Sequence, residues 1–193
     1  MSSDAACRHE GQSVARSEEI VVNANATLRN VFVYISSSFG ARQFPVPKDS
    51  VVLDQRGCRY LPRVFGIQIG QPLVLLNNDD TFHNVYAAAK INRPFNLGMT
   101  LSVRKLTRTF ERPEVMVPFR CNVHPWMASY AGVLNHPFYS VTGEAGTFRL
   151  EKLPAGEYEV TAWHERLGVM KQSVRVQESE SKELSFKFEF KQL

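Results

Sequence analysis

The sequence predicts an all-β protein that contains two sandwiches of antiparallel strands. Three observations support this fold class. Short apolar runs alternate with polar residues at a period of two, clusters of Gly, Pro, Asn and Asp separate the runs, and almost no segment has helical periodicity. The length of 193 residues allows one or two domains at about 100 to 200 residues each. A hydrophobic content of 44% is enough for folded cores, so we expect a globular chain.

The expected strands follow from these apolar runs. In chain order they are Ile20–Val22, Asn30–Ile35, Phe65–Ile69, Pro72–Asn77, Leu101–Leu106, Val115–Arg120, Gly146–Leu150, Tyr158–Trp163, Ser173–Gln177 and Leu184–Phe190. The last is the clearest, because its apolar residues alternate strictly with polar ones, and we expect it to close a sheet. Arg166–Lys171 contains a Gly and is expected to form a turn. Between Ser37 and Ser50, two Pro residues bracket a single Val, which indicates an extended linker and a domain boundary.

Charge and hydropathy exclude two classes of partner. The net charge of +4 comes from scattered Lys and Arg residues without an aromatic platform, so nucleic acid is not expected to bind. No apolar stretch approaches the roughly 18 residues of a membrane helix, so no transmembrane segment is expected. Met1–Gly11 also lacks the basic start and apolar middle of a secretory signal.

The strongest chemical signal is the segment Cys-Asn-Val-His-Pro-Trp-Met at positions 121–127, directly after an apolar strand. It brings a thiolate, an imidazole and a thioether into one short loop. Two His and one Cys with a weak axial Met form an electron-transfer copper site. His83 can supply the second imidazole, because it lies in the loop after Pro72–Asn77 and loops of a sandwich meet at its ends.

The order His83-Asn84-Val85 followed by Cys121 to Met127 resembles the cupredoxins, in particular the amicyanin-type blue copper domains, over Val51–Val133. The resemblance implies a Greek-key sandwich with one type 1 copper. The metal ligands that it implies are His83, Cys121, His124 and Met127, the last of them axial. The resemblance also implies that Asn84 ties the two ligand loops together by hydrogen bonding. Apart from the resemblance, the residue types predict that Pro125 stiffens the loop and that Trp126 excludes water.

Other interpretations of these residues are weaker. Each residue alone is commonly structural: a buried Cys, a loop His, a core Met or Trp. Zinc is a poorer match, because a thioether is a poor zinc ligand and no water-activating carboxylate has a defined place. A thiol nucleophile lacks an orienting third residue. The further ligand histidines of two-domain copper reductases are absent, so the protein is not expected to be an enzyme. His136, His164 and Glu165 could form a second metal site, but we expect them to be structural or on the surface.

Two cysteines remain once Cys121 is assigned to the metal. Cys7 and Cys58 suggest a disulfide, with two free thiols as the alternative. A disulfide indicates an oxidising compartment. We therefore expect a periplasmic or extracytoplasmic protein, with an export signal that this chain does not carry.

The sequence from His136 onward resembles the carboxypeptidase regulatory-like domain, a small transthyretin-like sandwich without catalysis. The resemblance rests on Gly146-Thr-Phe, on Leu153-Pro-Ala-Gly and on the strand around Tyr158. The combination is similar to methylamine-utilization-type proteins of the plastocyanin family. The predicted division is a tail at 1–17, the first strands of the regulatory-like sandwich at 18–40, the cupredoxin domain at 51–135 and the regulatory-like sandwich at 136–193. The copper domain is thus expected to be inserted into the other sandwich.

The sequence therefore predicts a type 1 copper protein for one-electron transfer in an extracytoplasmic redox chain. Its expected partner is a redox protein or a membrane-bound electron-transfer complex. The alternative is a non-catalytic accessory or structural subunit of a larger membrane-associated redox complex, with copper optional. Electrons are expected to leave through the ring edge of His124, near solvent and rimmed by Val123, Pro125 and Trp126.

Overall fold

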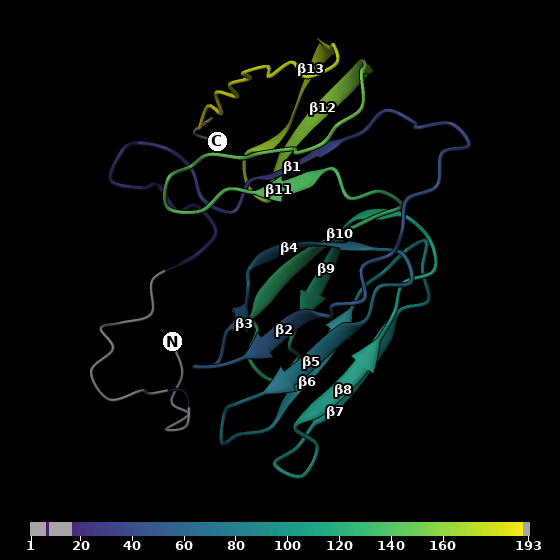
Figure 1. Cartoon of the computed structure of the whole chain (residues 1–193). Helices are drawn as coiled ribbons and strands as arrows, with labels where there is room; N and C mark the ends of the chain where they lie inside the picture. The colour runs from purple at the N-terminus through teal and green to yellow at the C-terminus, as the bar shows by residue number, and fades with distance from the viewer. Residues whose placement is uncertain (1–6, 8–16, 191–193) are drawn as a thin grey trace. The chain divides into compact units, whose positions relative to one another are not determined.

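The computed structural model describes Cys7 and residues 17–190. Thirteen strands in three sheets make up the regular structure of this part of the chain, which confirms the all-β prediction. It divides into two compact units, one containing Gln43–His136 and the other containing Glu18–Arg42 together with the chain from Pro137 onward (Figure 1). The predicted tail at 1–17 lies outside the described residues except for Cys7 and Ser17, and so do residues 191–193. Within the described ranges, no helix has the length and apolarity needed to span a membrane.

The first unit is a sandwich of two sheets. The larger sheet has the order β4 (Val64–Gln68), β10 (Ala128–Leu134), β9 (Glu114–Arg120), β6 (His83–Ala87) and β7 (Phe95–Met99). The smaller sheet has the order β3 (Tyr60–Leu61), β2 (Val51–Gln55), β5 (Leu73–Asn77) and β8 (Lys105–Arg108). Pairing is antiparallel except between β4 and β10 and between β2 and β5. The predicted sandwich is therefore confirmed for this unit.

The core of the first unit lies between its two sheets. Along β5, Leu73 and Leu75 are buried and alternate with half-buried residues, as expected for a strand with one face on a core. Val117 and Phe119 of β9 are buried in the same cluster. Each such side chain contributes about 1.5 to 3 kcal/mol of burial free energy. This packing fixes the strand ends from which the candidate site is built.

The second unit contains one sheet, with the order β11 (Tyr139–Val141), β1 (Phe32–Ile35), β12 (Gly156–His164) and β13 (Gly168–Val176), all antiparallel. Strand β1 precedes Gln43–His136 in the sequence, and both of its neighbours follow that segment. Gln43–His136 of the first unit is thus enclosed in sequence by the two segments of the second unit, whereas Cys7 precedes both.

Two strand predictions for the second unit are wrong. Gly146–Leu150 and Leu184–Phe190 lie outside the strands, although their side chains keep the alternating burial that suggested strands. Their apolar faces are used in aromatic contacts instead of a ladder: Phe148 and Phe186 have ring centroids 6.0 Å apart. In the described part of this unit, one sheet therefore takes the place of the expected two-sheet sandwich.

Two other strand predictions and one turn prediction differ at their bounds. Ile20–Val22 is reduced to one isolated bridge between Val22 and Leu28. Residues 101–104 precede β8, which begins at Lys105. The expected turn at Arg166–Lys171 is shorter than predicted, because β13 already begins at Gly168, where a φ of +85° suits glycine.

Candidate metal centre

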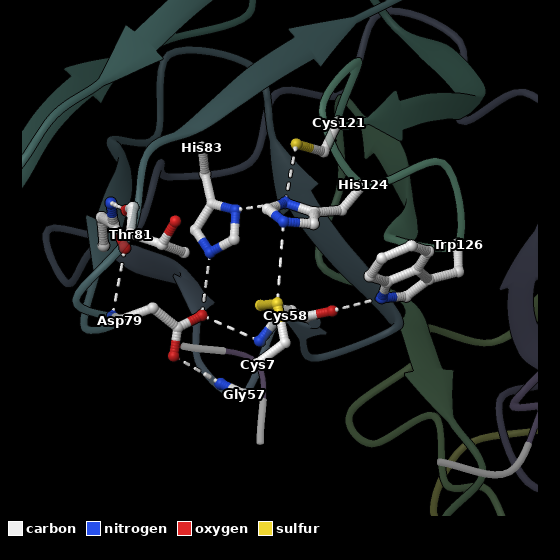
Figure 2. Close-up of a disulfide and its surroundings, with 10 residues drawn as sticks. Cys7, Gly57, Cys58, Asp79, Thr81, His83, Cys121, His124 and Trp126 are labelled. Carbon is white, nitrogen blue, oxygen red and sulfur yellow. Dashed lines mark hydrogen bonds and ion pairs between the residues drawn. A yellow bond between two sulfur atoms is a disulfide. The ribbon is translucent and has the colours of Figure 1, made fainter. Parts of the chain in front are cut away.

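Three predicted ligands meet in the first unit. The Nδ1 atoms of His83 and His124 lie 2.9 Å apart, and Cys121 Sγ lies 3.9 Å from His124 Nδ1 (Figure 2). All three donor atoms lie within 4.8 Å of one another. The residues are 0%, 2% and 2% exposed for His83, Cys121 and His124 respectively, so the donors face one another away from solvent.

Neighbouring strands of the larger sheet position these ligands. His83 is the first residue of β6, which corrects the expectation that it lies in a loop. The turn between β5 and β6 is held by Asn77, whose Nδ2 donates to the carbonyls of Thr81 and Met99. Cys121 directly follows β9, which pairs with β6.

The loop after Cys121 is short and closed by its own backbone. The N–H of Met127 donates to the carbonyl of His124 over 2.9 Å, and β10 begins at the next residue. Met127 is 1% exposed and belongs to the same buried cluster as Cys121. As an axial ligand it stays a prediction.

Asn84 connects the two ligand segments. Its Oδ1 accepts the N–H of Asn122 at 2.7 Å and lies 3.4 Å from Cys121 Sγ. Its Nδ2 donates to Asn96 on β7 at 2.6 Å. The Tyr60 hydroxyl adds a second connection, donating to the carbonyls of Asn84 and Arg120. The ends of β6 and β9 are therefore held together around the donors.

Sequence reasoning missed Asp79. Its carboxylate lies 2.9 Å from His83 Nε2 and accepts the backbone N–H groups of Gly57 at 2.6 Å and Cys58 at 2.8 Å. The side chains of both Asp79 and His83 are fully buried. The only signal in the sequence was an Asp four residues before the His, in a polar stretch that indicated nothing more than a loop.

Cys7 and Cys58 form a disulfide with a Cα–Cα distance of 5.2 Å. Cys7 Sγ lies 3.6 Å from His124 Nε2. Since a disulfide sulfur carries no hydrogen, His124 Nε2 is the donor in this contact. The expectation that the His124 ring edge lies near solvent is wrong, because the disulfide covers that edge and His124 is 2% exposed.

The predicted rim is exposed even though the ring is not. Val123 is 48% and Trp126 is 37% exposed, and Pro125 is also exposed. The rings of Trp126 and His124 have centroids 5.2 Å apart, and Trp126 Nε1 donates to the carbonyl of Cys58 at 3.0 Å. Figure 2 shows Trp126 beside His124, with its Nε1 directed at the carbonyl of Cys58.

The charges of the site are strongly coupled. Burial raises the pKa of the Cys121 thiol, but hydrogen bonds from His83 and from backbone N–H groups outweigh burial and lower the pKa to about 6. Burial lowers the pKa of His83, but hydrogen bonds with Asp79 and Cys121 raise it to about 9. Near pH 7 a thiolate thus faces a protonated imidazole, so a positive charge lies among the donor atoms.

The donor set fits a single metal ion. Both Nε2 atoms are engaged, His83 with a carboxylate and His124 with a disulfide sulfur, so both Nδ1 atoms face the site. The two Nδ1 atoms lie 2.9 Å apart, and Cys121 Sγ lies 3.9 Å from His124 Nδ1. A metal ion binds nitrogen at about 2.0 Å and sulfur at about 2.3 Å, so each distance is shorter than the two bonds that would bridge it. One ion can therefore contact all three donors. Thiolate and imidazole donors suit a soft or borderline transition metal.

The residues considered for a second metal site lie apart from this one. His136 is buried in the first unit, with its ring edge-on to that of Phe44. His164 is buried in the second unit, where its Nδ1 accepts the backbone N–H groups of Arg166 and Leu167 at 3.3 Å. Over the described residues, neither they nor Glu165 belong to a cluster of potential metal ligands.

No family model matches the chain, and no curated protein matches it. Among solved structures, a copper-containing nitrite reductase from Thermus scotoductus SA-01 is 19% identical with a TM-score of 0.41, and the match covers 50% of this chain and 24% of that one. Two amicyanin variants are similar at a TM-score of 0.40. A methionine-to-alanine variant with Cu(I) is 19% identical, and a reduced proline-to-glycine variant is 20% identical. Each match covers 52% of this chain and 97% of the amicyanin chain.

Proposed function

We propose that this protein binds one type 1 copper ion and uses it for one-electron transfer. The observation that carries the proposal is the convergence of His83 Nδ1, His124 Nδ1 and Cys121 Sγ in a buried site. Met127 is the proposed axial ligand, since it closes the same loop and is buried. A trigonal set of two imidazoles and a thiolate with a weak thioether is the ligand set of electron-transfer copper sites.

The surroundings of the donors favour copper over zinc. A catalytic zinc site keeps an open position for water and a carboxylate to activate that water. Asp79, the carboxylate beside His83, is instead engaged by protein groups, since it accepts two backbone N–H groups and a bond from His83. The three donors also face one another, which favours an electron carrier over an enzyme that must admit a substrate.

The role of the protein frame is to keep the ligands still. Bound copper supplies the one-electron redox chemistry. Asn84 and Tyr60 hold the ligand-bearing strand ends together, and the closed turn from His124 to Met127 limits movement of the loop. A rigid, dry set of ligands needs little rearrangement when the charge changes.

The proposed setting is an extracytoplasmic redox chain, with a redox protein or a membrane-bound electron-transfer complex as partner. The disulfide supports an oxidising compartment such as the periplasm. A second candidate is an accessory or structural subunit of a larger redox complex. It is favoured by the second compact unit, which adds a separate sheet and, in its described residues, no cluster of metal ligands.

Copper titration of the metal-free protein tests the proposal. Cu(II) should produce an intense thiolate-to-copper visible band, a matching electron paramagnetic resonance spectrum and a reversible one-electron potential. Cys121→Ser should abolish the band. His136→Gln is the matched control, because it removes a buried histidine of the same unit that belongs to none of the clusters of potential metal ligands in the described residues, and it should keep the band. A colourless protein that binds one zinc tightly would show the proposal to be wrong.

A further inference from the structure

The carboxylate of Asp79 is a fully buried charged group beside the donors. Its side chain is 0% exposed, and it accepts hydrogen bonds from Gly57 N, Cys58 N and His83 Nε2 at 2.6, 2.8 and 2.9 Å. Figure 2 shows the carboxylate beneath the His83 ring, on the side opposite the other donors. A buried carboxylate is costly unless such bonds compensate it, so its presence calls for a role.

The backbone around Asp79 is also fixed. Its N–H donates to Asn77 Oδ1 at 3.1 Å, and the guanidinium of Arg104 donates to its carbonyl. The position of the carboxylate is therefore set by the fold before any metal binds.

This geometry determines which ring nitrogen of His83 carries a hydrogen and which one faces the other donors. An ionised carboxylate only accepts hydrogen bonds, so His83 Nε2 must carry a hydrogen. The other ring nitrogen, Nδ1, then faces Cys121 and His124, and it offers its lone pair to a metal once its own hydrogen has left. A carboxylate on the outer nitrogen of a ligating histidine fixes the tautomer and raises the basicity of the inner nitrogen.

We propose that Asp79 is a positioning residue for His83, which holds the ring in the metal-binding tautomer and biases the site toward the more highly charged state of the bound ion. The inference rests on the proposed copper site. A full negative charge behind one ligand stabilises Cu(II) more than Cu(I), so Asp79 lowers the reduction potential.

The same carboxylate couples His83 to the disulfide. Asp79 binds the N–H of Cys58, the carbonyl of Cys58 accepts from Trp126 Nε1, and the disulfide sulfur of Cys7 contacts His124. Residues 57–58 thus support both histidine ligands, and a change in Asp79 should act on the site through position as well as charge.

Replacing Asp79 tests the inference, and the neighbouring Asp80 provides a matched control. The Asp80 side chain is 92% exposed and pairs with Arg104 at 2.9 Å, so Asp80→Asn removes an equal charge one residue away. Asp79→Asn should weaken Cu(II) binding about 10- to 100-fold, as loss of such partners generally does. If Cu(I) affinity is kept, each factor of ten raises the potential by about 59 mV. Asp80→Asn should match the wild type in both quantities.

Asp79→Glu keeps the charge with a longer side chain and should recover part of the affinity and potential. Equal affinity and potential in the wild type and Asp79→Asn, with copper bound by both, would overturn the inference and leave the proposed function intact. A wild type that forms no copper–thiolate site would overturn the proposed function instead.

A measurement on the metal-free wild type needs no variant to fold. Long-range nitrogen–proton NMR should show His83 Nε2 protonated, with slow hydrogen exchange because the group is buried against Asp79. A His83 with its hydrogen on Nδ1 and a bare Nε2 would overturn the inference even if every Asp79 variant failed to fold.

Discussion

The two histidines of the donor set are each held through the nitrogen that faces away from the site. His83 is held by an ionised carboxylate, and His124 by the sulfur of a disulfide. The first partner is a strong, charged acceptor, and the second is a weak one. We therefore expect His83 to be the more rigidly oriented and the more basic ligand.

A second buried carboxylate acts on the frame instead of the donors. Glu114, the first residue of β9, accepts the N–H groups of Lys90 and Asn92 at 2.5 and 2.9 Å and the Asn92 side chain at 3.0 Å. Burial raises the pKa of Glu114, but these bonds outweigh burial and lower it below its ordinary value. Glu114 thus anchors the connection after β6 to the strand that leads to Cys121.

Glu114→Gln should destabilise the protein near pH 7 by about 1 to 3 kcal/mol, because it removes a charged acceptor from buried N–H groups. A carboxyl with a lowered folded-state pKa stabilises the fold above its unfolded pKa, and this contribution is lost as the pH falls through the folded pKa. The gap between wild type and variant should therefore shrink from pH 7 to about pH 3 in urea unfolding.

The exposed Glu111 offers the control for this experiment. Glu111→Gln should unfold like the wild type at both pH values. A Glu114→Gln variant whose deficit stayed constant with pH would contradict the ionised role of the carboxylate.

At the scale of elements, the segment Leu184–Phe190 is held by side chains in place of a ladder. Phe186 packs against Phe148 and Phe188 against His164, each with centroids 6.0 Å apart. One backbone carbonyl, that of Ser185, accepts from Gln172 on β13. The attachment of Leu184–Phe190 to the rest of the second unit should thus depend on the rings of Phe186 and Phe188.

Phe186→Ala should lower the stability of the second unit by about 1 to 2 kcal/mol, since a half-buried ring and an aromatic pair are lost. Phe190 is 68% exposed, and Phe190→Ala is expected to have little effect. Hydrogen exchange and thermal unfolding of both variants measure the difference. Equal losses in the two variants would mean that the alternating face does not hold the segment.

At the scale of the whole molecule, the disulfide between Cys7 and Cys58 has a sequence separation of 51 and closes a covalent loop that includes Glu18–Arg42 of the second unit. In the chain-entropy model a loop of this length stabilises the folded state by about 4 kcal/mol. It also covers the outer edge of His124, so one cross-link serves both the stability of the unit and the seclusion of the donors.

Cys7→Ser should therefore lower the unfolding free energy by about 4 kcal/mol in denaturant unfolding of the metal-free protein. Wild type treated with a dithiol reductant should lose a similar amount, because the same cross-link is opened. Removing the cover should also speed hydrogen exchange at His124 Nε2. Unchanged stability and exchange in both samples would show that the bond neither stabilises the unit nor shields the ring.

The sequence by itself determined what is local. The period-two runs at Pro72–Asn77 and Val115–Arg120 became β5 and β9, because a strand with one buried face needs such alternation in any β-sandwich. Cys121, His124 and Met127 could be named together, because one short loop carries them all. Two leftover cysteines suggested a bond that the structure contains.

Only the tertiary structure decided what depends on distant parts of the chain meeting. Nothing near Asp79 or Cys7 in the sequence indicates that one lies behind His83 and the other over the edge of His124. Likewise, alternation in Leu184–Phe190 predicts a buried face but not a ladder, because a ladder needs a partner backbone, and here aromatic side chains supply the contact. Side-chain type and spacing are properties of the chain, whereas burial and hydrogen-bond partners are properties of its packing.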